Sequence, residues 1–504
     1  MDQKYSEIEN NAYPVDLQQI PLLSYDDFTG VVKELLKVEE NHCLNYFSIQ
    51  KEGDLIFYCL IASDAKRNIK IFSHRLNKNN PSLTSITPDI QALQIFEREI
   101  YENSGVGFMG HPWLKPVRYP HDKAIKTAMA GYPFYSIESE ELHEVGVGPV
   151  HAGVIEPGHF RFICNGEKVL HLEIQLGYQH RGIEKLFIEK DNALQRCILS
   201  ESIAGDTSVG HALAHAQLIE SLAGIQASES LQIERCIALE LERMAVHIGD
   251  TAALCGDVAY QLGQVVCEAL RTLIINATQL WCGNRFGKGL IRPDGSNYPL
   301  TDEIADAILK VLDDTEKRFG EITALIFSLP SVLARFEDIG QVTREQALAI
   351  GAVGMAARTC GIKRDIRSSH PFQYFREYPV APVILESGDV LARARIRDLE
   401  FRESVRIIRD LIDIRKKKNT GSATPIYNYT LKPGSIAVSI VEGWRGEICH
   451  IAITDNNGKI AGYEIKDPSL HNWMALALAV RNQEISDFPV CNKSFNLSYC
   501  GNDL

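Results

Sequence analysis

Titratable side chains that could carry acid–base chemistry gather in four short stretches of this sequence. Imidazoles and carboxylates exchange protons near neutral pH when burial shifts their pKa values. A carboxylate and an arginine one helical turn apart are more often an ordinary ion pair, and a single histidine is more often structural, so each stretch alone favours a structural role. Together they predict a polar cavity. The stretches hold His151 and His159; His180, Arg181, Glu184 and Lys185; Glu240, Arg243 and His247; and Asp365, Arg367, His370 and Tyr374.

The twelve cysteines form no recognisable metal or redox motif. The two closest, Cys491 and Cys500, are nine positions apart, so the CxxC spacing of zinc, iron–sulfur and dithiol sites is missing. Most cysteines lie in apolar runs such as FYCL and QVVCE, which favours small buried hydrophobes. A cytosolic chain of this size also has no need of disulfides.

Composition limits the class of protein. The chain has 504 residues, 45% of them hydrophobic, with 52 basic and 65 acidic side chains. This length predicts roughly two to four domains. The net charge of −13 argues against a nucleic-acid partner. Neither an apolar run long enough for a membrane span nor a signal peptide is recognisable, so we expect a cytoplasmic protein that is soluble or peripheral to a membrane.

Residues 1–135 are predicted to form a small α+β domain. FTGVVKELLKV (28–38) has helical spacing, and a second helix is expected towards the end of residues 81–105. Three prolines in GHPWLKPVRYP predict an irregular connector over residues 110–120. Short strands are expected at residues 45–50, 54–62 and 68–74.

Residues 136–504 are predicted to form a larger, mainly helical domain with β decoration, which makes the fold class α+β. Glycines and apolar runs indicate a small antiparallel sheet around residues 148–178. Residues 434–465 alternate as strands around an NNGK turn. An apolar stripe recurs every three or four residues from Ile233 to Ile248. Helices are expected within residues 185–280 and over residues 301–320, 343–358 and 389–415.

Several motifs of the second domain occur in the order of a known family. Over about residues 145–504 the chain resembles the large subunit of nickel–iron hydrogenases and its relative in respiratory complex I, the forty-nine-kilodalton subunit. The stretch FEREIYENSGVGFMGHPWLKP is similar to the thirty-kilodalton subunit of complex I that docks beside it. A fusion of the two is typical of membrane-bound, energy-converting group 4 hydrogenases. The motifs are GPVH, GEKVLHLEIQLGYQHRGIEKL, ELERMAVHIGD, GNRFGKGLIRPDG, GIKRDIRSSHPFQYF, GDVLARARIRDLEFRESV and DPSLHNWMALALAVRNQEISDFP.

The resemblance implies a metal site whose ligands this chain lacks. Working hydrogenases hold nickel and iron with thiolates from two CxxC pairs, soft ligands for soft metals. The matching positions here are Ala204 and Thr207 and, near the end, Ser498 and Gly501, with Cys500 one position away. One displaced thiol cannot rebuild a four-thiolate cage, so no metal is expected.

In complex I the resembling cavity binds the quinone headgroup between a hairpin histidine and a tyrosine that follows the first helix. The resemblance implies His159 for the hairpin position, with His151 as the alternative, because the stretch between them looks longer than in complex I. The tyrosine position falls near Gly205, and no tyrosine occurs between Tyr178 and Tyr260. The usual quinone clamp is therefore incomplete.

The resemblance also implies roles for the charged residues. Buried charges are costly without partners or a function, so these positions are candidates for the cavity, the coupling path or an interface. Those expected to be catalytic are His159, His151, His180 and Glu184; those around the cavity or coupling path are Arg181, Glu240, Arg243, Asp365 and Arg367; and those near a cluster-bearing partner subunit are Arg285 and Arg292.

These expectations favour a subunit of a membrane-associated, complex I-like oxidoreductase. Its cavity would pass electrons from an iron–sulfur cluster in a small partner subunit to a quinone or another two-electron acceptor. Antiporter-like membrane partners would translocate ions and hold the chain on the inner face of the cell membrane. No cofactor is expected to be bound covalently or through cysteines of this chain.

Two alternatives remain open. A non-catalytic scaffold of a membrane ion-transport complex fits the missing thiolates and tyrosine, whereas the many titratable groups count against it. An active nickel–iron hydrogenase with an unusual site is the remote alternative. The chain has no glycine-rich dinucleotide fingerprint, so any link to NAD(H) would run through other subunits.

Overall fold

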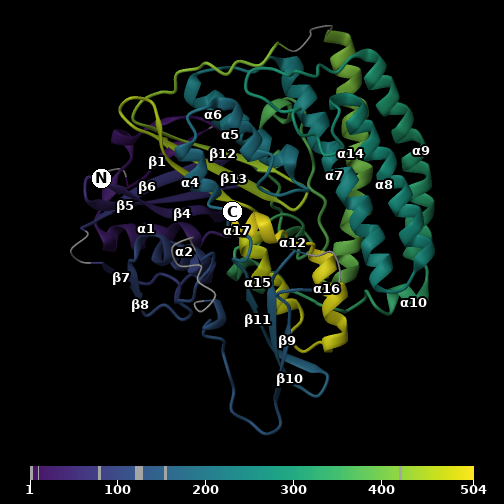
Figure 1. The fold of residues 1–504 in the computed structure, drawn as a ribbon, viewed down its shortest axis with the longest axis horizontal. Helices are drawn as coiled ribbons and strands as arrows, with labels where there is room; N and C mark the ends of the chain where they lie inside the picture. The colour runs from purple at the N-terminus through teal and green to yellow at the C-terminus, as the bar shows by residue number, and fades with distance from the viewer. Residues whose placement is uncertain (1–3, 10, 78–80, 120–128, 152–155, 419–422) are drawn as a thin grey trace.

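The computed structural model describes residues 4–9, 11–77, 81–119, 129–151, 156–418 and 423–504. These residues form several sheets and many helices, which confirms the predicted α+β class (Figure 1). Across the described ranges, no helix is both long and apolar enough to cross a membrane.

The N-terminal domain is built on a five-stranded sheet of order β1-β6-β5-β4, with β3 beside β6. Side chains alternate along each strand, so the sheet serves two cores. Phe57, Cys59 and Ile61 pack with helix α1, whereas Tyr58 and Leu60 join the core of the large domain. The predicted strands and both helices are confirmed. Their bounds are β1 (Ser6–Ile8), β3 (Leu22–Leu23), α1 (Tyr25–Leu36), β4 (Asn41–Lys51), β5 (Asp54–Ser63), β6 (Asn68–Leu76) and α2 (Gln94–Ser104), and a parallel pair, β7 (Ser82–Thr84) and β8 (Gly107–Met109), flanks α2.

Two further sheets belong to the large domain and confirm the predicted strands. One is antiparallel with order β11-β10-β9. The other has order β14-β13-β12-β2, so an N-terminal strand completes a sheet of the C-terminal region. Gly458 in the predicted NNGK turn has a φ of 76°, which glycine tolerates. The bounds are β2 (Val15–Asp16), β9 (His143–Val147), β10 (His159–Asn165), β11 (Lys168–Gln175), β12 (Ser435–Glu442), β13 (Glu447–Thr454) and β14 (Ile460–Lys466).

Four long helices, α7, α8, α9 and α14, lie side by side at the far end of the large domain from β4 (Figure 1). The apolar stripe from Ile233 to Ile248 is buried, as predicted. The helices are α4 (Ile183–Glu189), α5 (Ala193–Ser200), α6 (Ser208–Ala223), α7 (Glu229–Asp257), α8 (Gln261–Cys282), α9 (Asp302–Ile326), α10 (Pro330–Leu333), α11 (Arg344–Ala349), α12 (Gly354–Arg358), α13 (Ile366–Ser369), α14 (Val390–Lys418), α15 (Ser469–Ala479), α16 (Phe488–Phe495) and α17 (Tyr499–Asp503).

The prediction of one continuous helix over residues 343–358 is wrong. The chain forms α11, breaks, and starts again at α12. Gly351 and Gly354 have φ values of 71° and 61°, which a right-handed helix does not accommodate. A Cβ at Gly354 would also lie 1.9 Å from the carbonyl oxygen of Arg445, so the backbone bends here to pass the β12–β13 turn.

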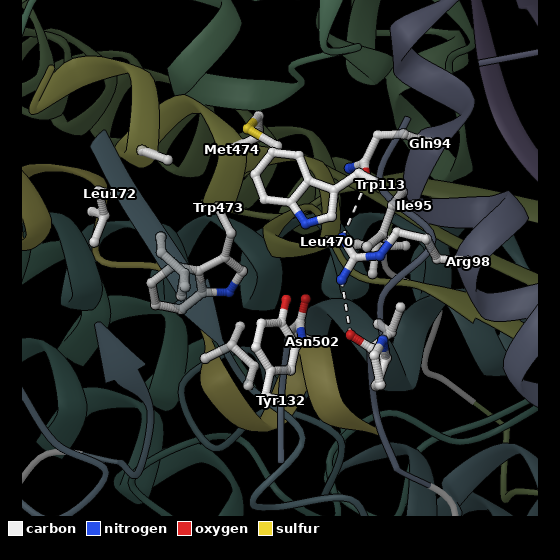
Figure 2. Close-up of a pocket in the computed structure, with 15 residues that line it drawn as sticks. Gln94, Ile95, Arg98, Trp113, Tyr132, Leu172, Leu470, Trp473, Met474 and Asn502 are labelled. Atoms are coloured by element: carbon white, nitrogen blue, oxygen red, sulfur yellow. Dashed lines mark hydrogen bonds between the residues drawn. The ribbon is translucent and has the colours of Figure 1, made fainter. Parts of the chain in front are cut away.

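The connector after α2 is irregular over residues 110–119, as predicted, and residue 120 lies outside the described residues. A cavity of about 70 Å³ marks the seam where this connector, α2, β11 and α15 meet (Figure 2). Arg98 donates to the carbonyls of Lys115 and Pro116, both at 2.8 Å, and so fastens the connector to α2. The domain boundary near residue 135 stays a prediction.

Candidate functional site

The two segments that are predicted to match the hydrogenase metal ligands meet at one arginine, Arg181. The Arg181 guanidinium donates to the carbonyls of Ser202 and Ile203, at 2.6 and 2.8 Å, and to the carbonyl of Cys500 at 3.0 Å. The turn before α6, which carries Ala204 and Thr207, is thereby joined to α17, which carries the last of the vacated positions. The predicted cavity residue Arg181 therefore acts on backbone rather than on an open space.

The side chains at this junction do not fit a nickel–iron site. A Cβ at Gly501 would lie 2.7 Å from the Asp467 carboxylate, so that carboxylate fills the space of a ligand side chain. The Thr207 hydroxyl accepts from Trp444 and Arg445, both at 3.2 Å. In the described part of the chain, no three or more His, Cys, Asp and Glu side chains are arranged to hold a metal ion.

A polar cavity of about 200 Å³ lies beside this junction. Arg445, from the β12–β13 turn, lines it and pairs with Asp206 at 2.6 Å. Asn492 and Lys493 of α16 supply further donors. Tyr499 of α17 lines the same cavity, and burial raises the pKa of its phenol to about 12, so the hydroxyl keeps its proton. The cavity therefore combines two cations with two carboxylates, Glu156 and Asp206, two amides and a neutral phenol.

Sequence reasoning missed Tyr499, although SYCG places this aromatic between two positions of interest. Its ring packs against the hairpin that carries the predicted quinone histidine, because a Cβ at Gly158 would lie 2.7 Å from the ring. Its backbone amide donates to Glu156, a carboxylate that also lines the cavity, at 3.3 Å. Gly205, where complex I is expected to place its tyrosine, has no atom within 4 Å of an added Cβ. Tyr499 therefore supplies a phenol to this cavity from a segment other than the one that carries Gly205.

The two hairpin histidines make different contacts. His159 opens β10, its Nδ1 lies 3.0 Å from the Gly148 carbonyl, and its ring meets Phe134 at 5.3 Å. The ring of His151 lies 6.0 Å from Phe160, whose ring in turn lies 6.4 Å from Tyr499. Because neighbouring residues of a strand point to opposite faces, His151 packs on the Tyr499 side of the sheet and His159 on the other. Residues 152–155 between them lie outside the described residues.

His180 contacts the last residues of the chain, and Glu184 lies where the two domains meet. The Nδ1 atom of His180 lies 2.7 Å from the Asp503 carbonyl. Glu184 accepts from the Ile465 amide at 2.8 Å and lies 4.0 Å from Arg118 of the N-terminal domain. Burial raises the pKa of Glu184 to about 7, although Arg118 opposes the shift. Glu184 is therefore a buried carboxyl that can exchange a proton near neutral pH.

The four predicted coupling residues of α7 and the start of α13 come together in a fully buried charge network. Arg243 donates to Glu240 at 3.1 Å, and Arg367 donates to Glu240 at 3.0 Å and to Asp365 at 2.7 Å. Although burial opposes it, Arg367 and Arg358 lower the pKa of Asp365 to about 2. The network has three arginines and four carboxylates, each at most 1% exposed: Arg243, Arg358, Arg367, Glu240, Asp365, Glu400 and Glu442.

Arg358, Glu400 and Glu442 were not singled out from the sequence. Arg358 donates to Glu442 at 2.6 Å and also to Glu400, so it joins β12 to α14. His247, the other titratable residue of its stretch, lies 2.8 Å from Glu400. His370 points elsewhere, with its Nε2 3.2 Å from the Asn68 carbonyl of the N-terminal sheet.

Two family descriptions match this chain. The respiratory-chain NADH dehydrogenase 49 Kd subunit matches residues 257–429, and the 30 Kd subunit matches residues 23–134. The NADH-quinone oxidoreductase D subunit of Dehalococcoides mccartyi is 30% identical over 346 residues, which cover 68% of this chain and 93% of that protein. The chain belongs to the family of the respiratory-chain NADH dehydrogenase 49 Kd subunit. Its N-terminal part carries the 30 Kd module, so the fusion expected from the sequence is confirmed.

Hydrogenase components are also relatives of this NADH dehydrogenase-family subunit. Formate hydrogenlyase subunit 5 of Escherichia coli is 26% identical over 447 residues, which cover 85% of the chain and 78% of that protein. The membrane-bound sulfane sulfur reductase, an archaeal respiratory membrane complex, shares the fold with a TM-score of 0.66 at 21% identity, covering 73% of this chain and 100% of that one. The chain is therefore an oxidoreductase subunit whose relatives include hydrogenase components and NADH-quinone oxidoreductase subunits.

The two arginines predicted at a partner interface differ in exposure. Arg292 is 5% exposed and pairs with Glu201, so its guanidinium is committed inside the subunit. Arg285 is exposed, lies over the Phe286 ring at 5.7 Å and lines a small pocket with Arg271. Their place at a partner interface stays a prediction, and Arg285 is the one that a partner could reach from solvent.

Gly501→Ala is expected to lower the free energy of unfolding by about 1–3 kcal/mol, because the added Cβ would press on the Asp467 carboxylate. Gly205→Ala is the matched control, since nothing lies within 4 Å of its Cβ, and it should stay within about 0.5 kcal/mol of the parent. Urea unfolding of both variants measures the difference. Equal stabilities would mean that Asp467 does not fill the vacated position.

Proposed function

We propose that this subunit reduces a quinone-like acceptor in the cavity beside Arg445, within a membrane-associated, complex I-like assembly. Electrons would come from an iron–sulfur cluster in a small partner subunit, and antiporter-like membrane partners would couple the reaction to ion translocation. The observation that carries the proposal is the cavity itself. It adjoins the positions that match the hydrogenase metal ligands, and it holds hydrogen-bond donors in place of thiolates.

The cavity suits the reduction of a ring carbonyl. Two-electron reduction places negative charge on a quinone oxygen, and a preorganised cation stabilises such charge as it develops. Arg445 and Lys493 supply that cation from two elements. The Tyr499 phenol, neutral because its pKa is about 12, can donate a hydrogen bond to the second carbonyl. A volume of about 200 Å³ is smaller than the roughly 300–1,000 Å³ of pockets for whole drug-sized ligands, which fits a headgroup alone.

The protons for the reduced acceptor would come from residues predicted from the resemblance. His159 is the predicted hairpin donor, and His151 is the alternative on the Tyr499 side of the sheet. Glu184 has a pKa of about 7 and so can supply a proton at neutral pH. Ion translocation would follow from a charge change felt by the buried network, because Arg243 donates to the Gly443 carbonyl at 3.1 Å in the same turn that carries Arg445.

Tyr499→Phe is expected to slow acceptor reduction by about 10–100-fold, because one of the two carbonyl donors is lost while the ring remains. The measurement is low-temperature electron paramagnetic resonance on the complex purified in mild detergent. The partner cluster is reduced with a donor and then mixed with ubiquinone, menaquinone or polysulfide. Tyr298→Phe, at a tyrosine that is 40% exposed to solvent, is the matched control and should reoxidise like the parent.

His159→Ala and His151→Ala assign the hairpin donor in the same experiment. The variant that halts cluster reoxidation by quinone identifies the histidine in use. A cluster that reoxidises with polysulfide alone would change the acceptor class while keeping the site. A complex without any cluster signal, or with a cluster indifferent to every acceptor, would overturn the proposal in favour of the scaffold.

A further inference from the structure

Five titratable side chains form a continuous hydrogen-bonded chain through the interior beside the vacated metal site. The Asp467 carboxylate lies 3.0 Å from His211 Nε2, and His211 Nδ1 lies 3.0 Å from His450 Nε2. His450 Nδ1 lies 2.9 Å from the Tyr463 hydroxyl, which lies 2.9 Å from His215 Nδ1. The hydrogen-bonded chain draws on α6, on β13, and on β14 with the residue that follows it, so three separate segments are folded to complete it.

The hydrogen-bonded chain lies in the protein interior. All five side chains are at most 1% exposed. Phe187 of α4 stacks on Tyr463 with ring centroids 4.1 Å apart and covers His215 at 5.1 Å. Burying this many polar groups is costly unless they are hydrogen-bonded, and here each side chain is hydrogen-bonded to its neighbour along the series.

One proton arrangement satisfies every link. His211 donates from Nε2 to Asp467 and accepts at Nδ1 from His450. His450 accepts at Nδ1 from the Tyr463 hydroxyl, and Tyr463 accepts from His215 Nδ1. Each donor thus points towards Asp467, and the Nε2 atom of His215 is left as an open acceptor with no hydrogen-bond partner in the described residues.

The electrostatics keep His215, His450 and Tyr463 uncharged. Burial lowers the pKa of His215 to about 3 and that of His450 well below its ordinary value, so both imidazoles are neutral. Burial raises the pKa of Tyr463, which therefore keeps its proton. Burial opposes ionisation of Asp467, yet the hydrogen bond from His211 lowers its pKa, so a carboxylate stands ready at the end.

The Asp467 end lies directly behind the wall of the polar cavity. A Cβ at Gly501 would touch both the Asp467 carboxylate, at 2.7 Å, and the Ser498 hydroxyl, at 2.9 Å. Leu497 and Tyr499, on either side of Ser498, line the cavity. The hydrogen-bonded chain therefore ends next to the segment that walls the place where the acceptor is proposed to bind.

We propose that Asp467, His211, His450, Tyr463 and His215 form a proton relay that delivers protons to the cavity beside Arg445. This inference rests on the proposed function. A proton that enters from solvent binds His215 Nε2, and the Nδ1 proton of His215 passes to the Tyr463 oxygen. The Tyr463 proton passes to His450 Nδ1, the His450 Nε2 proton to His211 Nδ1, and the His211 Nε2 proton to Asp467. Each link before Asp467 gains one proton and loses one. Asp467 then releases its proton to the reduced acceptor in the cavity, so the net change is one proton moved from solvent to the acceptor.

The decisive variants remove the relay while keeping the shape. Tyr463→Phe deletes the central hydroxyl, and His450→Gln keeps a donor and an acceptor but cannot pass a proton from one to the other. Tyr429→Phe is the matched control, because this tyrosine packs against the same core cluster and its buried hydroxyl has no hydrogen-bond partner among the described residues. All are made in the full chain and assembled into the complex.

The first readout is acceptor reduction in H2O and in D2O after the partner cluster has been reduced. Tyr463→Phe and His450→Gln are expected to slow reoxidation by about 100-fold and to enlarge the solvent isotope effect, with cluster reduction itself unchanged. Tyr429→Phe should match the parent. Parent-like rates and isotope effects in both relay variants would overturn the relay while leaving the proposed function intact. If His450 had a purely structural role, His450→Gln would keep the parent rate of reoxidation, because glutamine retains a donor and an acceptor.

The second readout does not need an acceptor. Nitrogen-15 NMR of histidine-labelled complex reports which ring nitrogen carries the proton. The relay requires His211 and His450 protonated at Nε2 and His215 at Nδ1. A different tautomer at any of the three would overturn the relay. If the parent complex reduces no acceptor but shows these tautomers, the proposed function fails and the hydrogen-bonded chain stands as a property of the fold.

Discussion

Arg358→Met is expected to destabilise the subunit by about 3–5 kcal/mol, because it leaves two buried carboxylates short of a counter-charge. Arg358 is fully buried and donates to Glu442 at 2.6 Å and to Glu400. Without it, the hydrogen bond left to Glu442 among the described residues is the one from the Ile366 amide at 3.0 Å, whereas Glu400 still has His247. Methionine fills much of the volume, so the loss comes from charge rather than from a cavity. Urea unfolding of the purified subunit measures it.

Arg402→Met is the matched control for that experiment. Arg402 lies on α14, half-exposed, and pairs with Asp398 one turn away. An exposed pair of this kind contributes about 0–1 kcal/mol, so the same substitution should have little effect there. A second comparison adds Glu442→Gln to Arg358→Met. Removing one orphaned charge should recover part of the lost stability. Equal costs for Arg358→Met and Arg402→Met would contradict a network held by charge balance.

The sequence predicts those parts of this site whose interacting residues lie close together along the chain. Glu240 and Arg243 share a helical face, and Asp365 and Arg367 are two residues apart, so local spacing was enough to single them out. Their partner Arg358 lies on a short helix inside a stretch whose pattern indicated one continuous helix. Nothing local marks that arginine as central, because its role depends on β12 and α14 passing on either side.

Polar residues inside strands were the hardest to interpret. Glu442, His450 and Tyr463 lie on strands, and a polar side chain on a half-buried strand ordinarily points towards solvent. Here β12 and β13 are buried along their whole length, because α6 packs against them and the N-terminal domain approaches the same sheet. His211 and His215 are spaced one turn apart in GHALAH, which the sequence does show. Their partners lie more than two hundred residues away, so only the fold reveals the hydrogen-bonded chain they form.

The buried charge network around Arg358 holds four carboxylates and three arginines. This excess of one carboxylate predicts how the stability of the subunit changes with pH. Burial raises the pKa of Glu442 from 4.5 to about 7, with Asp365 adding to the shift and Arg358 opposing it. Between these values the folded chain holds a proton that the unfolded chain has released. The folded state therefore binds more protons, and the free energy of unfolding falls as the pH rises from about 4.5 to 7. Well above pH 7 both states are ionised and the loss is complete.

Glu442→Gln should flatten this part of the pH dependence. At about 1.4 kcal/mol per pKa unit, the parent loses up to about 3 kcal/mol between about pH 4.5 and 8 because of this one group. Glutamine cannot ionise, so that contribution disappears, although the variant also weakens acceptance from the Ile366 amide and is less stable at low pH. The slope of stability against pH reports the ionisation alone, whereas the weakened hydrogen bond lowers the stability at every pH. Urea midpoints across the range give it for the parent, for Glu442→Gln, and for Glu184→Gln, whose pKa of about 7 arises at a separate site and whose contribution should add. Identical slopes for the parent and Glu442→Gln would place the extra proton of the network on another group.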